Sequence, residues 1–266
     1  MSFPSIDVGD RLHALLGRPV VDIGTLWEVC AHFEWADRQS TVDGIAAWLG
    51  PAPGLQVLDS ACGSGFPVID LFRRGYDVAC SDGSPAMLTH FRRNAAGLGL
   101  EPQCVRWEDL AGHFGPGRFD VVMCRGCSFL YAGTWDNDSQ PDRGALVAIM
   151  RQFVACLRPG GRLYVDTARA DSLAAQGWSH SPRRGLTIGT HHVELEEWLT
   201  NKPDEGIRLW HSRLTVDGRV HEFERRSHYL PHSELVALMT SAGLVDVRAE
   251  HVEGEYYQVF TGRRLD

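Results

Sequence analysis

The sequence lacks any apolar stretch long enough to cross a membrane. No run approaches the roughly 18 uninterrupted apolar residues that a membrane helix needs, and the N-terminus shows no basic segment followed by an apolar one. A basic surplus is missing too, because 26 Lys and Arg stand against 34 Asp and Glu, for a net charge of -8. We therefore expect a cytoplasmic protein that binds neither membrane nor nucleic acid.

The cysteines do not form the pairs that a disulfide framework or a metal site requires. Seven cysteines are an odd number, and several lie in apolar runs where a small thiol packs well. Cys124 and Cys127 have the Cys-x-x-Cys spacing, but no second Cys or Cys/His pair with ligand spacing follows. His191 and His192 would point to opposite faces of a strand. We expect reduced structural thiols and no metal.

Strand and helix patterns alternate through the middle of the chain. Helical spacing dominates up to about residue 50, and then short apolar runs alternate with amphipathic ones as far as Asp166, with strands expected at 55–59, 77–80, 103–106, 119–124 and 161–166. Such βαβ repetition is typical of a parallel sheet with helices on both faces. With 266 residues, 44% of them hydrophobic, the chain is long enough for one such core and a modest lid.

The pattern changes after Asp166. Residues from about 186 to 228 alternate apolar and polar side chains, and Asp217-Gly218 is a strong hairpin turn. A helix over 231–242 and strands over 244–248 and 256–260 then return to the sheet. We therefore divide the chain into an N-terminal helical cap (1–50), a core (51–167), an antiparallel β-rich lid insertion (168–230) and a closing helix with strands (231–266).

A glycine loop follows the first expected strand. Asp59 ends the strand, and Gly63 and Gly65 precede a helix, so a ligand can approach the backbone closely. A dinucleotide-binding loop needs a third glycine or alanine, which the run from Gly63 to Val68 lacks. A carboxylate beside the loop also suits a ligand with a cationic amine better than one with a pyrophosphate.

This loop resembles motif I of the class I S-adenosylmethionine (SAM)-dependent methyltransferases. The resemblance continues at Asp82, which matches the acid that holds the ribose hydroxyls, and at Trp107, which would pack on the adenine. The runs 119–124 and 158–163 complete the pattern. It implies a Rossmann-like, seven-stranded α/β fold with an antiparallel last strand, and SAM as the cofactor with S-adenosylhomocysteine as the product. Taken alone, the glycines also fit an ordinary tight turn, Asp82 a helix cap, and Trp107 ordinary core packing.

The cofactor contacts that the resemblance implies come from several places along the chain. They are Arg38, Asp59, Ala61, Cys62, Gly63, Gly65, Asp82, Gly83, Met87, Trp107, Glu108, Asp109, Cys124 and Arg125.

The segment after the fourth strand bears on the methyl acceptor. It lacks the Asn-Pro-Pro-Tyr type motif of DNA amino-methyltransferases. The chain is similar instead to glycine and glycine/sarcosine N-methyltransferases, at residues 37–49, at 106–107, at Gly126 with 128–129, and in the β-rich segment after Asp166. It departs from them at Cys127, where they usually have Asn, and at Arg169, one place out of register with their carboxylate-binding Arg.

This second resemblance implies a small amine or amino-acid-like acceptor. We expect four residues beside the acceptor: Arg125, Ser128, Tyr131 and Arg169. Arg125 or Arg169 would hold its anionic group. Equally, Arg125 could pair with an internal acid or bond the SAM carboxylate. Two other functions stay open: an O- or C-methyltransferase of a natural-product intermediate, and a non-catalytic SAM-binding protein. A homo-oligomer is also possible.

A hydroxyl acceptor would need a general base, for which the candidates are Glu28, His32, His180 and His228. Residues 168–230 and 27–38 should roof the methyl site. Aromatic side chains that could line it are Trp27, Phe33, Trp35, Phe129, Tyr131 and Trp135.

Overall fold

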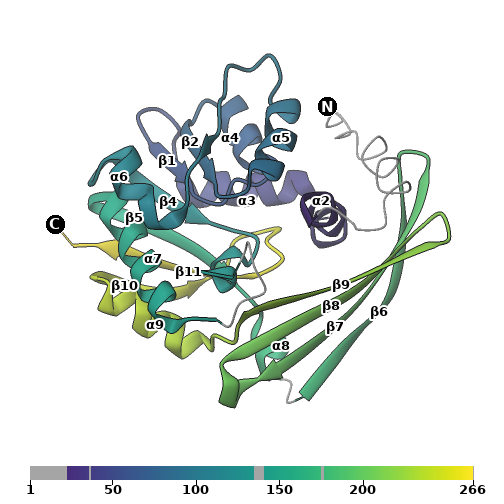
Figure 1. Cartoon of the computed structure of the whole chain (residues 1–266). Coiled ribbons are helices and arrows are strands. Elements are labelled where there is room, and N and C mark those ends of the chain that lie inside the picture. Colours follow the sequence, from purple (N-terminus) through teal and green to yellow (C-terminus); the bar gives the residue numbers. More distant parts are fainter. Residues whose placement is uncertain (1–22, 36, 135–140, 175–176, 266) are drawn as a thin grey trace.

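A seven-stranded sheet forms the centre of the protein (Figure 1). The computed structural model describes residues 23–35, 37–134, 141–174 and 177–265. The strand order is β10-β11-β5-β4-β1-β2-β3. The strands are β1 (Gln56–Asp59), β2 (Asp77–Asp82), β3 (Gln103–Cys104), β4 (Phe119–Cys124), β5 (Leu157–Thr167), β10 (Leu244–Glu250) and β11 (Gln258–Arg264).

The last strand runs opposite to the others. The pairs β1–β2, β2–β3, β1–β4 and β4–β5 are parallel, whereas β11 is antiparallel to both β5 and β10. All six residues of β4 are buried, as a strand covered on both faces requires. The expected Rossmann-like sheet with an antiparallel last strand is therefore confirmed.

Helices cover both faces of this sheet (Figure 1). One buried cluster joins β4 and β5 to α6 (Leu110–Phe114), α7 (Arg143–Cys156) and α9 (His232–Ser241). Two others lie under α3 (Arg38–Leu49), α4 (Val68–Arg73) and α5 (Pro85–Asn94). Side-chain caps fix where helices begin: Asp37 accepts from the Ser40 amide at 3.0 Å, and Ser84, ahead of Pro85, accepts from Met87 at 3.4 Å.

A second sheet of four antiparallel strands extends away from the core (Figure 1, green). It consists of β6 (Gly177–Ile188), β7 (His191–Lys202), β8 (Ile207–Val216) and β9 (Arg219–His228), with α8 (Ala170–Ala174) ahead of it. The expected antiparallel addition is confirmed, and its first strand begins nine residues before the alternating pattern at Leu186 suggested. The bulge between Ser181 and Arg184 breaks strict alternation there and accounts for the difference.

Helix α2 (Ile23–Glu34) packs on the side of the second sheet that faces the core. Its buried residues Leu26, Val29 and Cys30 share one cluster with apolar residues of β6, β7 and β8, among them Ile188, Val193, Leu195, Trp210, Leu214 and Val216. The N-terminal helix and the second sheet therefore form one wall. Within the described residues, no helix is long and apolar enough to span a membrane.

A test of this packing uses two helical glycines with opposite surroundings. In α3, a Cβ on Gly44 would lie 2.1 Å from the Glu253 carbonyl oxygen, whereas nothing lies within 4 Å of one on Gly112 in α6. Alanine is otherwise favoured over glycine in a helix by about 1 kcal/mol. Gly44→Ala should therefore lower the free energy of unfolding by about 2 kcal/mol through overpacking, and Gly112→Ala should raise it. Urea unfolding measures both, and a stabilised Gly44→Ala protein would refute the close contact between α3 and the β10–β11 loop.

Candidate functional site

The glycine loop lies at the carboxyl ends of β1 and β2. Gly63 has a φ of 51° and Gly65 a φ of 110°, a region that side chains rarely adopt. A Cβ on Gly63 would lie 3.2 Å from the Met87 methyl, and one on Gly65 would lie 2.3 Å from Ile69 Cδ1. Gly63 therefore keeps a hollow open, whereas Gly65 lets the loop pack against α4.

Asp82 ties this loop to the end of β2. Its Oδ2 accepts from the Gly63 amide at 3.0 Å and its Oδ1 from the Ser84 amide at 2.8 Å. Burial raises the pKa of Asp82 to about 6, although both hydrogen bonds lower it. A carboxylate can accept further bonds beyond these two, so Asp82 can also receive hydroxyl donors of a ligand.

Two hollows meet along this edge of the sheet. The first, the loop groove, has about 730 Å³ of empty space including open solvent and is lined by Trp27, Ala31, Glu34, Trp35, Arg38, Ala61, Cys62, Gly63, Ser64, Phe66, Asp82, Met87, Arg125, Gly126 and Ser128. The second, the Trp107 groove, has about 580 Å³ and is lined by Ser60, Ala61, Asp82, Gly83, Arg106, Trp107, Glu108, Ser128, Tyr131 and Gly133. The grooves share Ala61, Asp82 and Ser128, so one elongated ligand can occupy both.

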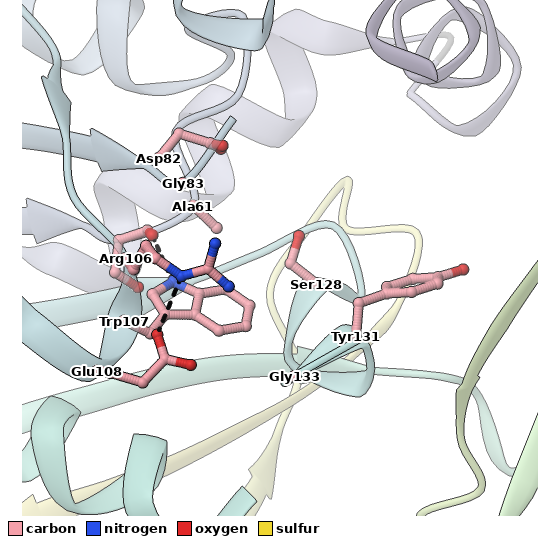
Figure 2. A pocket seen from close by; sticks show the side chains of 10 residues that line it. Ala61, Asp82, Gly83, Arg106, Trp107, Glu108, Ser128, Tyr131 and Gly133 are labelled. Atoms are coloured by element: carbon pink, nitrogen blue, oxygen red, sulfur yellow. Dashed lines mark hydrogen bonds and ion pairs between the residues drawn. The ribbon is translucent and has the colours of Figure 1, made fainter. Parts of the chain in front are cut away.

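Figure 2 shows the Trp107 groove from close by. The indole is held in place because its Nε1 donates to the Ser60 carbonyl at the end of β1, at 2.6 Å. Arg106 and Glu108 flank it as an exposed ion pair with 3.8 Å between Nε and Oε2. On the opposite side, the Tyr131 ring points away from Trp107.

A third hollow, the inter-sheet cavity, lies between the core and the second sheet. It has about 700 Å³ of empty space including open solvent and is lined by Trp27, Glu34, Cys127, Leu130, Tyr131, Ala168, Arg169, Ser172, Ser181, Glu197, Leu199, Arg208, Trp210, Ser227, Tyr256 and Tyr257. Trp27 and Glu34 also line the loop groove, and Tyr131 also lines the Trp107 groove. The cavity therefore adjoins both grooves at these three residues.

Aromatic contacts build this junction. The Trp27 ring stacks on Trp210 with centroids 4.9 Å apart, and its edge meets Tyr131 at 5.7 Å. Glu34 lies among these rings, and its Oε1 accepts from the Tyr257 hydroxyl at 2.7 Å. Burial raises the pKa of Glu34 to about 8, with the Tyr257 hydrogen bond opposing the rise.

The segment after β4 is fixed by two buried carboxylates. Arg125 Nε and Nη2 each donate to Glu255 at 2.7 Å, and the two side chains are 4% and 1% exposed. Burial alone would raise the pKa of Glu255, but the charge and hydrogen bonds of Arg125 hold it below its usual value. Asp166 accepts from the Gly126 and Cys127 amides at 2.9 and 2.7 Å, and burial raises its pKa to about 7.

Arg125 is therefore not placed as the acceptor's anion-binding residue. Its guanidinium is paired with an internal acid, one of the alternatives above, and that acid is Glu255 on the β10–β11 loop. Its guanidinium lies over the Trp35 and Phe66 rings, at 5.4 and 5.7 Å. Nη1 is the nitrogen that can still reach a ligand in the loop groove.

Ten of the fourteen expected cofactor residues line the two grooves. Four lie elsewhere. Asp59 is 2% exposed and accepts from the Ala61 amide, Gly65 serves packing, Cys124 is buried within β4, and Asp109 is exposed outside both grooves. The side chains of Asp59, Cys124 and Asp109 thus face the fold or solvent and not the two grooves.

The expected acceptor residues separate in a similar way. Ser128 lines both grooves, Tyr131 lines the inter-sheet cavity, and Arg169 lines it with a side chain that is 62% exposed and 3.7 Å from Asp171. Phe129 is fully buried in the core, and Phe33, in α2, packs against the cluster between α2 and the second sheet; neither lines one of the three hollows. Trp135 lies outside the described residues.

The histidines considered as general bases do not line these hollows. His180 is exposed and pairs with Glu196 at 2.9 Å, and buried His228 bonds the Ala132 carbonyl at 3.0 Å. His32, in α2, is likewise absent from the three linings, and the side chain of Glu28 is outside what the structure describes. Sequence reasoning gave no individual role to four charged residues of the site: Glu34, Glu197, Arg208 and Glu255.

All seven cysteines are free thiols, and only Cys104 is exposed. Across the residues that the structure describes, no group of three or more His, Cys, Asp or Glu side chains could hold a metal ion.

Comparison with known proteins agrees with this geometry. A methyltransferase domain model matches residues 57–161. The glycine/sarcosine N-methyltransferase of Halorhodospira halochloris is 30% identical over 171 residues, which are 60% of either chain. The ubiquinone biosynthesis O-methyltransferase of Xanthomonas euvesicatoria is 31% identical over 189 residues, 62% of this chain and 72% of that one.

Among solved structures, Streptomyces venezuelae DesVI has a TM-score of 0.71 at 21% identity, with 92% of this chain and 99% of that one covered, which shows a shared fold. This chain spans only 60% of the length of the Halorhodospira relative. The matched domain contains the glycine loop, Asp82 and the parallel strands β2, β3 and β4, and the Xanthomonas relative is covered over 72% of its length. The chain therefore belongs to the class I SAM-dependent methyltransferases, the family whose cofactor is SAM.

Proposed function

We propose that this protein transfers a methyl group from SAM to the nitrogen of a small amine or amino-acid-like acceptor bound in the inter-sheet cavity. The observation that carries the proposal is the junction at Trp27, Glu34 and Tyr131, where a cavity with both acidic and basic side chains adjoins the cofactor grooves. The glycine/sarcosine relatives support an amine, since their names specify one.

The two grooves fit SAM. Gly63 keeps open the space that a Cβ would narrow against Met87, and Asp82 has acceptor capacity at the end of β2, where ribose hydroxyls can donate. Trp107 offers an apolar face for the adenine, and Arg125 Nη1 and Arg38 in the loop groove suit the amino-acid end. When bound, SAM supplies an electrophilic methyl group: the acceptor nitrogen forms the new C–N bond as the C–S bond breaks, and S-adenosylhomocysteine keeps that electron pair.

The chain's own residues supply alignment, exclusion of water and a proton acceptor. Methyl transfer is an in-line displacement, so holding the two reactants in register accounts for much of the acceleration. Trp27, Trp210 and Tyr131 enclose the junction and limit its contact with water. An acceptor that binds as an ammonium ion must lose a proton before its nitrogen can attack, and Glu34, in its deprotonated form, is the carboxylate at the junction that can accept it.

O-methylation of a small hydroxylated acceptor is the second candidate. The ubiquinone-pathway relatives favour it, because they match this chain about as well as the glycine enzymes do. Glu34 would serve there as the general base. Glycine, sarcosine, ethylamine, phenol and catechol, incubated with methyl-labelled SAM and analysed by mass spectrometry, separate the two candidates. Label on a hydroxyl oxygen and on no amine would overturn N-methylation.

Asp82→Ala should weaken SAM binding by about 1.5 to 3 kcal/mol, because charge-assisted bonds to the ribose are lost. Asp77→Ala is the matched control, since Asp77 begins the same strand and its exposed carboxylate accepts from Gln56 Nε2. Isothermal titration with SAM measures both variants, and circular dichroism checks their folding. Wild-type affinity in folded Asp82→Ala would show that the ribose lies elsewhere.

The pH dependence of turnover should follow Glu34. Its pKa of about 8 lies above that of an ordinary carboxyl, so the proton-accepting form increases as the pH rises through 8. With glycine or ethylamine as acceptor, kcat/KM should rise up to that pH, and Glu34→Gln should reduce it by at least about tenfold.

Tyr257→Phe supplies the sharper test, because its hydroxyl lowers the pKa of Glu34. Its loss should move the rising limb of the pH profile to higher pH. Glu224→Gln, at an exposed position of β9, is the control. An unshifted profile in Tyr257→Phe, together with full activity in Glu34→Gln, would exclude Glu34 as the proton acceptor.

A further inference from the structure

Arg208 is a buried cation on the wall of the inter-sheet cavity. It lies in β8 on the same side as Trp210 and Leu214, which face the core, and only 6% of it is exposed. Arginine is rarely buried to this extent unless it is paired. A charged side chain on the apolar, inward-facing side of β8 therefore requires an explanation.

Only neutral groups of the protein bond Arg208. Nη1 donates to Asn201 Oδ1 at 2.8 Å and to the Ser172 carbonyl at 3.2 Å, and Nη2 donates to Ser172 Oγ at 2.5 Å. Throughout the described ranges, no carboxylate lies within ion-pair distance of this guanidinium. The contrast with Arg125 is sharp, because that equally buried arginine is neutralised by Glu255.

The other charges of the cavity narrow the choice of ligand. Arg184 is already neutralised by Glu197, at 2.5 Å, and Glu197 also accepts from Trp210 Nε1 at 2.8 Å. Arg169 is mostly exposed and lies near Asp171. Arg208 and Glu34 remain as a buried cation and a buried acid without an oppositely charged partner in the described structure. Such a cavity suits a ligand that carries one negative and one positive group.

We propose that Arg208 binds the carboxylate of the methyl acceptor, and that the acceptor is therefore an amino acid or a closely related amino carboxylate. The three bonds to Asn201 and Ser172 hold the guanidinium in place and leave further N–H donors for a carboxylate, whose planar geometry matches them. The acceptor's amine then lies toward Glu34. This inference depends on the proposed function in one respect only, that the atom methylated is the acceptor's nitrogen.

Matched pairs of probes that differ only in a carboxylate test the proposal. They are glycine and methylamine, alanine and ethylamine, phenylalanine and phenethylamine, and 4-hydroxybenzoate and phenol. Titrated into the protein saturated with S-adenosylhomocysteine, the carboxylate member of at least one pair should bind about tenfold more tightly or better than its partner. If no carboxylate member binds more tightly than its partner, Arg208 does not recognise a carboxylate and the inference fails.

Arg208→Gln should abolish that preference by weakening the carboxylate member about 10- to 100-fold, with SAM affinity unchanged within about twofold. Arg208→Lys keeps the charge and should retain part of the preference, which separates recognition from a folding defect. Arg213→Gln is the matched control, because Arg213 lies on the outer face of the same strand and pairs with Glu222 and Glu196. Preference that survives in Arg208→Gln and is lost in Arg169→Gln would assign the role to Arg169 and overturn the inference.

Failure of the proposed function has a different signature. If 4-hydroxybenzoate is methylated and no amine is, N-methylation is wrong. Arg208 is then supported only if its Gln variant loses the preference for 4-hydroxybenzoate over phenol, and is refuted if that preference persists.

Discussion

The buried ion pair between Arg125 and Glu255 is the constraint on which the site depends. Arg125 leaves the end of β4, and Glu255 comes from the loop between β10 and β11, 130 residues later. Tyr164 and Trp35 donate to the same carboxylate, at 2.6 and 3.3 Å, so β5 and the chain ahead of α3 are joined to it as well. Removing one partner would leave an uncompensated buried charge, which typically costs about 3 to 5 kcal/mol. The pair therefore positions the floor of the loop groove and keeps Arg125 from serving a variable ligand.

The inter-sheet cavity follows the opposite principle. There the protein buries a cation, Arg208, without an acidic partner among the described residues, and a carboxyl group, Glu34, whose pKa burial raises to about 8. Desolvation of the guanidinium and of the ionised form of Glu34 opposes folding. Two neutral side chains would pack at lower cost. A bound zwitterion would give both groups the interactions that water no longer supplies. The desolvation that destabilises the empty protein would thereby favour a zwitterionic ligand over an uncharged one. An acceptor without charge would leave both groups unsatisfied and would bind less well.

The fold was largely predictable from the sequence, because strand and helix periodicities and the motif I loop are local signals. The β4 strand was placed to the residue, and the resemblance put Asp82 at the end of β2, whose periodicity alone had predicted a strand only as far as Cys80. Glu255 could not be identified as the partner of Arg125, because only the returning strand β11 brings the two together. Arg208 did leave a signal. In the alternating run over 208–216 it has the same parity as Trp210 and Leu214, so a charge stood on the face that the pattern assigns to the core.

The residues proposed to select the acceptor lie outside the domain that this chain shares with its relatives. The matched domain spans residues 57–161 and contains the glycine loop, Asp82 and Trp107, all of which concern the cofactor. Glycine/sarcosine N-methyltransferases and ubiquinone-pathway O-methyltransferases are alike in identity to this chain, so that shared core does not choose the acceptor. Glu34, Arg208 and Trp210 all lie outside residues 57–161, on α2 and the second sheet. Displacement at a methyl carbon needs only alignment and, where required, loss of a proton. Under the proposed function, changes in these walls would therefore change the acceptor while the core is retained.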